Sequence, residues 1–240
     1  MSLSRIISRA PVTFQASRQL RLRSALPLGP RLSSTMADPA PSRRLKNPII
    51  FVCDLQDKFR NAIWQFDKIL LTSQKVLRAA QILKIPVIAT TQNGQKLGPI
   101  VAELQPLIQD AALHLDKTLF SMLTPEVAAH ALLAPTPPRR EVVIVGIETH
   151  ICVTQTALDL LARGHKVYVL ADGVSSCNEE EVPVALARLR AEGAVVTTSE
   201  SWLFEAMGDA AIAEFRDVAR LVKETGPDTK VALAGLLSKM

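Results

Sequence analysis

The chain has 240 residues, of which 48% are hydrophobic, and it carries a formal net charge of +5. This hydrophobic content is enough for one large core, so the composition excludes a chain dominated by disorder. Six of the 28 basic residues are arginines within the first 35 residues, where no acidic residue occurs. The other 22 basic residues stand against 23 acidic ones, a net charge of −1, which argues against a nucleic-acid-binding surface on the body of the protein.

The first 35 residues are rich in Arg, Ser and Leu and lack carboxylates, which is typical of a mitochondrial transit peptide. A disordered basic tail is the alternative interpretation. We predict a transit peptide at 1–35, a linker at 36–46 and a location in the mitochondrial matrix, and translation from Met36 would give a cytoplasmic form. No stretch approaches the roughly 18 consecutive apolar residues of a membrane span, so no membrane interaction is expected.

From Pro48 onward, short β-branched runs alternate with longer helical patterns, which favours repeated βα units, a parallel sheet and a single α/β domain over 47–225. The expected strands are 49–53, 87–90, 112–115, 142–145, 167–170 and 195–197. The expected helices are 69–83, 101–104, 125–133, 152–163, 180–192, 201–207 and 210–223. We expect 226–240 to be a poorly ordered C-terminal tail.

The segment 141–163 combines a buried strand, a glycine and a helical pattern that opens with Cys152. Such a thiol lies on the first helical turn at the carboxyl end of a strand, where free backbone N–H groups and the helix dipole favour a thiolate. The alternative is that Cys152 is a small buried core residue. The three cysteines, at 53, 152 and 177, form no CxxC pair and fit a reducing compartment.

Asp54 and Lys117 also follow predicted strands. In an open parallel sheet, ligands bind outside the carboxyl ends of the strands, so these two residues and Cys152 are candidates for one site. A carboxylate can accept the thiol proton, an ammonium can stabilise an anion, and sulfur can attack a carbonyl carbon. Spacing alone also allows Asp54 to be a turn cap and Lys117 a solvated surface lysine.

Three motifs together carry a family resemblance: Asp54-x-Gln56, the segment from Lys117 to Phe120-Ser121, and the segment from Gly146 to Val153. Over about 47–207 the chain resembles the isochorismatase-like cysteine hydrolases, a superfamily that includes the nicotinamidases. It is most similar to the isochorismatase domain-containing proteins, which have a segment like 92–99.

The resemblance implies a doubly wound, six-stranded parallel sheet in the order 3-2-1-4-5-6, flanked by helices. It implies that Asp54, Lys117 and Cys152 are base, cation and nucleophile, and that a cis peptide bond between Ile147 and Glu148 directs the backbone N–H groups of Glu148 and Cys152 at an oxyanion. The substrate-pocket and supporting residues that we predict are Gln56, Phe59, Gln92, Phe120 and Thr149. In the family, the residue at the place of Gln56 supports the acid, although it could also cap the loop. By strand alternation, Cys53 should pack as core on the opposite face, and Cys177 is expected to be incidental.

Nicotinamidases carry an Asp-x-His pair after strand two that binds a metal, whereas this sequence has Gln92, Asn93 and Gly94 there. The histidines, at 114, 130, 150 and 165, lack the i, i+4 spacing of a helical zinc site. We therefore predict no metal and no cofactor, and nicotinamide is a doubtful substrate. Cys152 argues against the vinyl-ether cleavage of true isochorismatases, which use no cysteine nucleophile.

These observations lead to a hypothesis: a metal-independent hydrolase that cleaves the C–N bond of a small amide-type metabolite through a thioester, and that assembles as a homo-oligomer. The alternative is a non-catalytic binding or scaffold protein that retains the fold. A nucleotide-binding module is disfavoured because the sequence has neither a GxGxxG nor a Walker A phosphate loop, and no GxSxG serine-hydrolase motif occurs.

Overall fold

A computed structural model describes residues 42–133 and 139–237. These residues belong to one compact unit, Ala40–Met240. The predicted transit peptide and the first part of the predicted linker lie outside the described residues. Within the described ranges, no helix is both long enough and apolar enough to cross a membrane.

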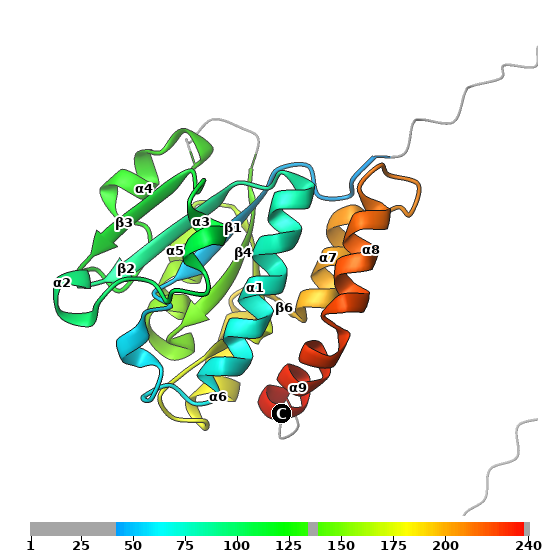
Figure 1. Cartoon of the computed structure of the whole chain (residues 1–240). Helices are drawn as coiled ribbons and strands as arrows, with labels where there is room; N and C mark the ends of the chain where they lie inside the picture. Colours follow the sequence, from blue (N-terminus) through cyan, green and yellow to red (C-terminus); the bar gives the residue numbers. More distant parts are fainter. Residues whose placement is uncertain (1–41, 134–138, 238–240) are drawn as a thin grey trace, which may run out of the picture. The chain divides into compact units, whose positions relative to one another are not determined.

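The core of the unit is one six-stranded sheet in which all neighbouring strands are parallel (Figure 1). The strand order, β3-β2-β1-β4-β5-β6, confirms the expected doubly wound topology. The strands are β1 (Pro48–Cys53), β2 (Val87–Gln92), β3 (Leu113–Lys117), β4 (Glu141–Ile147), β5 (Lys166–Ser175) and β6 (Val195–Thr197).

Four strands continue at their carboxyl ends beyond the predicted limits. Most of the added residues have low β-propensity, and hydrogen bonds to the neighbouring strand hold them in the sheet. Gln92 of β2 pairs with Lys117 of β3, and Ile147 of β4 pairs with Ser175 of β5. β5 is the largest case, since it runs to Ser175 where the pattern predicted an end at Leu170. These extended ends form the edge of the sheet where the candidate site lies.

Helices cover both faces of the sheet (Figure 1). The helices are α1 (Phe66–Leu83), α2 (Gly94–Leu97), α3 (Gln105–Ile108), α4 (Pro125–Ala129), α5 (Thr154–Ala162), α6 (Glu181–Ala191), α7 (Ser199–Met207), α8 (Phe215–Glu224) and α9 (Gly226–Leu237), with short helical turns η1 (Asp57–Phe59), η2 (Ala131–Leu133) and η3 (Thr149–Val153). Alternation along the strands divides the core: Ile50 and Val52 of β1 pack with α1, whereas Ile49 and Phe51 pack with α5 and α6.

Two short helices depart from the predicted limits. No helix covers 101–104; α3 begins at Gln105, and the buried Val101 and Leu104 belong to the loop before it. Their apolar spacing reflects burial of this loop against the core rather than helical periodicity. Similarly, α4 ends at Ala129, and the separate turn η2 carries the rest of the predicted 125–133 helix.

Both ends of the predicted domain were placed wrongly. The expected poorly ordered tail contains α9, which packs against α1 and buries Thr229, Ala232 and Leu236. Pro227 lies in the first turn of this helix, where proline is well tolerated. At the other end, Leu45 of the predicted linker is buried, and its backbone N–H donates to the carbonyl of Ala206.

Candidate active site

Asp54 directly follows β1 and turns its carboxylate into a buried environment. Its backbone has φ 53°, the left-handed region that Asp tolerates better than most residues, and the residue is 1% exposed. Oδ1 accepts a hydrogen bond from Thr90 Oγ1 at 2.8 Å, and Oδ2 accepts one from Lys117 Nζ at 2.7 Å. The carboxylate is therefore fixed from both sides.

Lys117 is the last residue of β3, and its side chain is fully buried. Nζ donates to four oxygens: Asp54 Oδ2 and Gln92 Oε1, each at 2.7 Å, and the carbonyls of Leu119 and Phe120, each at 3.1 Å. An ammonium has only three hydrogens, so these contacts use all of them. The alternative of a solvated surface lysine is wrong.

Two glutamines connect β1 and β2 beside this ion pair. Gln92 Nε2 donates to the carbonyl of Thr118 at 3.0 Å while Oε1 holds Lys117. Gln56 is fully buried; Oε1 accepts from the Gln92 backbone N–H at 2.7 Å, and Nε2 donates to the carbonyls of Gln92 and Gly98. Gln56 thus fastens the backbone at the end of β2, and its support of the acid is indirect rather than a direct bond to the carboxylate.

Cys152 is brought to the same edge by β4. Gly146 is required there because a Cβ atom would lie 2.1 Å from the carbonyl oxygen of Cys53, and its φ is 123°. The expected cis peptide bond between Ile147 and Glu148 is present. Cys152 is 7% exposed and lies in the π-helical turn η3, immediately before α5 rather than within its first turn.

Cys53 packs in the buried core as expected, but its thiol contacts the acid instead of facing away from it. Its thiol donates to Asp54 Oδ2 at 3.6 Å, and burial, a hydrogen bond with Cys152 and the charge of Asp54 raise its pKa well above the usual range. Strand alternation fails here because the left-handed backbone of Asp54 turns its side chain toward that of Cys53. Cys152 belongs to the same buried cluster as Cys53, whose thiol contacts Asp54.

The other predicted pocket residues occupy different surroundings. Phe120 is 52% exposed, and Leu119 beside it is equally exposed. Thr149 is fully buried, and its Oγ1 has no hydrogen-bond partner among the described residues. Phe59 packs against the core cluster on the α1 face, whereas Cys152 belongs to the cluster on the other face.

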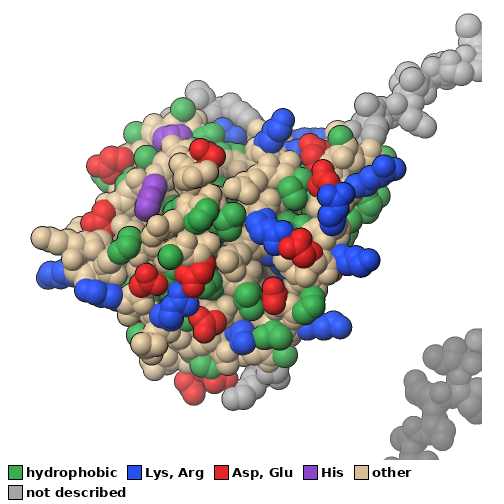
Figure 2. Space-filling view, viewed as in Figure 1, with side chains coloured by type: hydrophobic (Ala, Val, Ile, Leu, Met, Phe, Trp, Pro, Cys, Tyr) green, Lys and Arg blue, Asp and Glu red, His purple; other side chains and the backbone are tan. Residues whose placement is uncertain are grey.

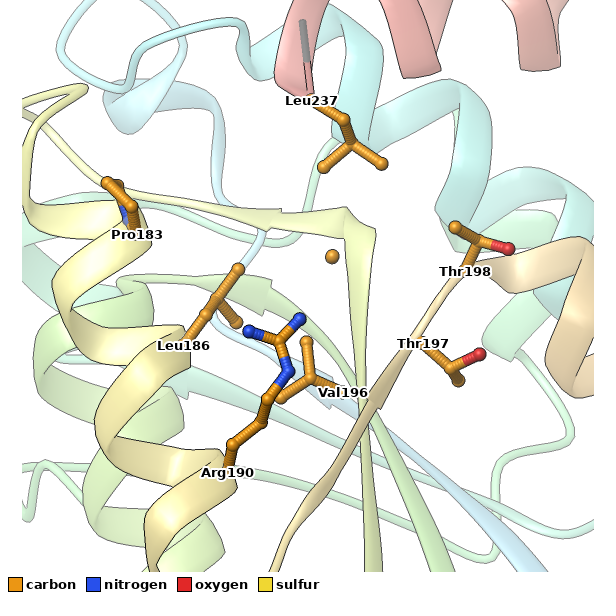
Figure 3. A pocket seen from close by; sticks show the side chains of 8 residues that line it. Pro183, Leu186, Arg190, Val196, Thr197, Thr198 and Leu237 are labelled. Carbon is orange, nitrogen blue, oxygen red and sulfur yellow. The ribbon is translucent and has the colours of Figure 1, made fainter. Parts of the chain in front are cut away.

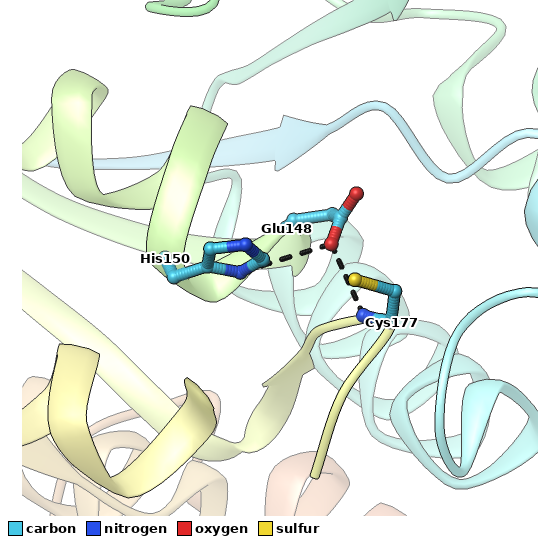
Figure 4. Close-up of side chains that lie close together, drawn as sticks. All are labelled: Glu148, His150 and Cys177. Carbon is cyan, nitrogen blue, oxygen red and sulfur yellow. Dashed lines mark hydrogen bonds and ion pairs between the residues drawn. The ribbon is translucent and has the colours of Figure 1, made fainter. Parts of the chain in front are cut away.

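A second polar cluster beside η3 was missed in the sequence. Glu148, His150 and Cys177 each contribute one potential metal-ligand atom, and these atoms all lie within 4.8 Å of one another (Figure 4). The Glu148 carboxylate accepts from the backbone N–H of Cys177 at 3.0 Å and, through a hydrogen bond to the thiol, raises the pKa of Cys177. Adjacency of the ends of β4 and β5 was the signal that could have revealed this cluster.

The residues at the position of the nicotinamidase metal site do not fit a metal in this protein. Both ends of the Gln92 side chain are occupied by hydrogen bonds, and Gly94 offers no side chain. Asp116, the nearby carboxylate, accepts from the Gly94 N–H at 2.7 Å and from Thr91 Oγ1 at 2.8 Å. No step of the chemistry is therefore assigned to a metal at this place.

A separate pocket lies between α6, β6 and the end of α9 (Figure 3). Leu186, Val196 and Leu237 give it an apolar lining, and the Arg190 side chain extends over it. None of its lining residues is a predicted site residue.

Comparisons with known proteins agree with this architecture. The family model described as the Isochorismatase domain matches residues 48–201. Isochorismatase domain-containing protein 2 of Xenopus laevis is 42% identical over 193 residues, covering 80% of this chain and 89% of that protein. The secreted isochorismatase effector Isc1 of Phytophthora sojae is 42% identical over 178 residues, covering 73% of this chain and 84% of that protein.

Among solved structures, the MAR1 ribonuclease from Caenorhabditis elegans is similar with a TM-score of 0.68 and 38% identity, over 76% of this chain and 93% of that one. The family model spans more than half of the chain, and the two relatives are similar over most of their own lengths. The chain therefore belongs to the isochorismatase family of hydrolases.

Proposed function

We propose that this protein is a cysteine hydrolase that cleaves the C–N bond of a small amide-type metabolite through a thioester on Cys152, without a metal. The observation that carries the proposal is the buried ion pair of Asp54 and Lys117, 2.7 Å apart, which the Cys53 thiol contacts from the same buried cluster that contains Cys152. Family membership supports hydrolysis as the reaction type.

In the proposed reaction, Asp54 takes the proton of the Cys152 thiol, and the thiolate attacks the carbonyl carbon of the substrate. The backbone N–H groups of Glu148 and Cys152 stabilise the oxyanion. The protonated Asp54 gives its proton to the departing amine as the C–N bond breaks. Asp54 then takes a proton from the water that attacks the thioester, and returns it to the Cys152 sulfur as the C–S bond breaks and the carboxylic acid is released.

Lys117 has no hydrogen left for a substrate, because four protein oxygens surround Nζ. We therefore assign it a positioning role: it orients the Asp54 carboxylate and pairs with it in a buried environment, where an unpaired charge would be strongly disfavoured. Gln92 fixes Lys117 in turn, and Gln56 fixes the strand end that carries Gln92.

The similar solved structure from Caenorhabditis elegans is described as a ribonuclease, so RNA is the second substrate class to test. Charge favours the small amide, because residues 36–240 carry 22 basic and 23 acidic residues. On the face shown in Figure 2, Lys and Arg are interspersed with Asp and Glu rather than gathered into a basic surface. We accordingly propose a small-molecule substrate and no nucleic-acid or membrane partner.

The test is a panel of small amides and an RNA oligonucleotide, assayed for amine release and strand cleavage with wild type and Cys152→Ala. We expect amine release by the wild type alone, and acid-quenched enzyme should carry an acyl adduct on the peptide that contains Cys152. Ligand binding without turnover would favour the non-catalytic alternative. RNA cleavage that Cys152→Ala retains would contradict the proposal.

We also propose that the full chain is imported into mitochondria, since the first 35 residues contain six arginines and no acid. A fluorescent fusion of residues 1–46 should enter mitochondria, and the same fusion with the six arginines changed to glutamine should stay in the cytosol. Diffuse signal from the unchanged fusion would exclude this targeting role.

We also propose that the protein forms a homo-oligomer. Leu119 and Phe120 are half-exposed apolar side chains beside the site, where contact with a second copy would cover them. Sedimentation analysis should give a mass above 26.1 kDa, and a monomer at all concentrations would contradict this part.

A further inference from the structure

The cluster of Glu148, His150 and Cys177 unites three different donor atoms from three segments. Glu148 directly follows β4, His150 lies in η3, and Cys177 lies two residues beyond β5. The segments meet because Ile147 pairs with Ser175 in the sheet. One carboxylate oxygen, one imidazole nitrogen and one sulfur therefore lie within 4.8 Å of one another. Figure 4 shows His150 and Cys177 on either side of the Glu148 carboxylate.

We propose that Glu148, His150 and Cys177 bind a Zn²⁺ ion, with the fourth coordination position open to water or another ligand. Thiolate and imidazole donors favour zinc over the hard cations Mg²⁺ and Ca²⁺, which prefer oxygen. Three protein ligands with one open position is a recurrent zinc arrangement.

The distances suit this assignment. Zinc-to-ligand bonds of about 2.0–2.1 Å place neighbouring tetrahedral oxygen and nitrogen ligands roughly 3.4 Å apart. His150 Nδ1 and Glu148 Oε2 are 3.7 Å apart, so a shift of a few tenths of an ångström closes the site around an ion. Cys177 is exposed and can rotate to complete the set.

One existing hydrogen bond orients a ligand before an ion arrives, because the backbone N–H of Cys177 holds Glu148 Oε2 at 3.0 Å. Ser176 Oγ is 2.9 Å from His150 Nδ1 and gives up this contact when the ring nitrogen binds an ion. The Glu148 and His150 side chains are 18% and 22% exposed, so the site is shielded on one side and still open to solvent. A divalent cation would also offset the repulsion between the Glu148 carboxylate and a Cys177 thiolate.

This site lies at the ends of β4 and β5. It is distinct from the position of the nicotinamidase metal site, which lies near Gln92 and Gly94 at the end of β2. The proposal does not depend on the proposed function, since binding is measured without substrate. An ion here would restrain Glu148 and η3, the turn that carries Cys152.

The test uses reduced, metal-free full-length protein titrated with Zn²⁺ against a chromophoric chelator, and with Co²⁺ as a spectroscopic probe of a sulfur ligand. We expect one ion per chain and a thiolate-to-cobalt charge-transfer band. Cys177→Ser, His150→Ala and Glu148→Gln should each weaken binding at least about tenfold, because even changes outside the ligand set weaken metal sites by about 10–100-fold. Cys152→Ser and His165→Ala are the matched controls and should bind as wild type does.

Three outcomes would overturn the proposal. Absence of stoichiometric Zn²⁺ binding is the first. Binding that survives Cys177→Ser and His150→Ala but is lost in Cys152→Ser would place the ion on the nucleophile instead. Equal competition by Mg²⁺ would indicate a non-selective carboxylate site. Glu148→Gln preserves the shape of the side chain, so it separates loss of a ligand from loss of folding.

Discussion

Two polar clusters lie at the carboxyl edge of the sheet, and they differ in burial. In the first, the Lys117 and Asp54 side chains are 0% and 2% exposed, and every hydrogen of the ammonium has an acceptor. In the second, Glu148 and His150 are partly exposed, and their nearest polar atoms are 3.7 Å apart. The turn η3 carries both Cys152 and His150 of the second cluster.

Burial explains the difference. A charge removed from water must be paired and hydrogen-bonded, which fixes one geometry and leaves no donor for a ligand. A partly exposed cluster keeps water as a partner and can exchange it for an ion. The buried cluster therefore suits the fixed positioning of a catalytic group, and the open one suits reversible binding.

The largest effect is expected from Asp54→Asn, which keeps the shape of the buried cluster and removes its proton acceptor. Turnover of the amide found in the panel should fall by about 10²–10⁴, the usual contribution of a general acid–base group. Asp116→Asn is the matched control, because this exposed carboxylate belongs to β3 and bonds Gly94 and Thr91 instead. Steady-state kinetics measures the turnover of both variants. Equal turnover by Asp54→Asn and Asp116→Asn would show that Asp54 is not the general base.

Lys117→Met tests burial itself, because it leaves the Asp54 carboxylate buried without its cation. The free energy of unfolding should fall by about 3–5 kcal/mol in urea denaturation. Arg78→Met is the comparison, because it breaks an exposed ion pair with Glu224 at 2.9 Å and should cost about 0–1 kcal/mol.

The double variant Asp54→Asn/Lys117→Met should recover part of the stability that Lys117→Met loses, since it leaves no unpaired charge. If Lys117→Met proved as stable as Arg78→Met, the contrast between the buried and the open cluster would have no energetic basis.

The smallest effect concerns thiol reactivity in the open cluster. Cys177 is exposed but its pKa is raised by Glu148, and Cys53 is fully buried with a pKa raised well above the usual range. Iodoacetamide at neutral pH, mapped by mass spectrometry, should therefore label Cys152 first and Cys53 last.

In the Glu148→Gln variant, iodoacetamide should label Cys177 severalfold faster than it does in the wild type. Loss of the carboxylate lowers the pKa of Cys177, which increases its thiolate fraction at pH 7 by about tenfold for each pKa unit. The labelling rate of Cys53 serves as the internal control. Wild-type protein that labels at Cys177 before Cys152 would argue against both the electrostatics and the nucleophile assignment.

The amino-acid pattern alone determined much of the fold. Alternating β-branched and helical runs predicted six strands, and all six are present, because a parallel sheet buried on both faces requires such runs. The motifs at Asp54, Lys117 and Cys152 indicated the family, the strand order and the cis peptide bond. The same pattern predicted a helix at 101–104, where a buried loop precedes α3, and a poorly ordered tail from 226, where α9 packs against α1.

Only the tertiary structure decided how the strand ends meet. It surrounded Lys117 with four oxygens, turned Asp54 toward Cys53, and joined Cys177 to Glu148 and His150. Periodicity reports which face of its own element a residue occupies. Contacts between the ends of different strands depend instead on register and on single backbone conformations, such as the left-handed Asp54, because these set side-chain directions where regular structure stops.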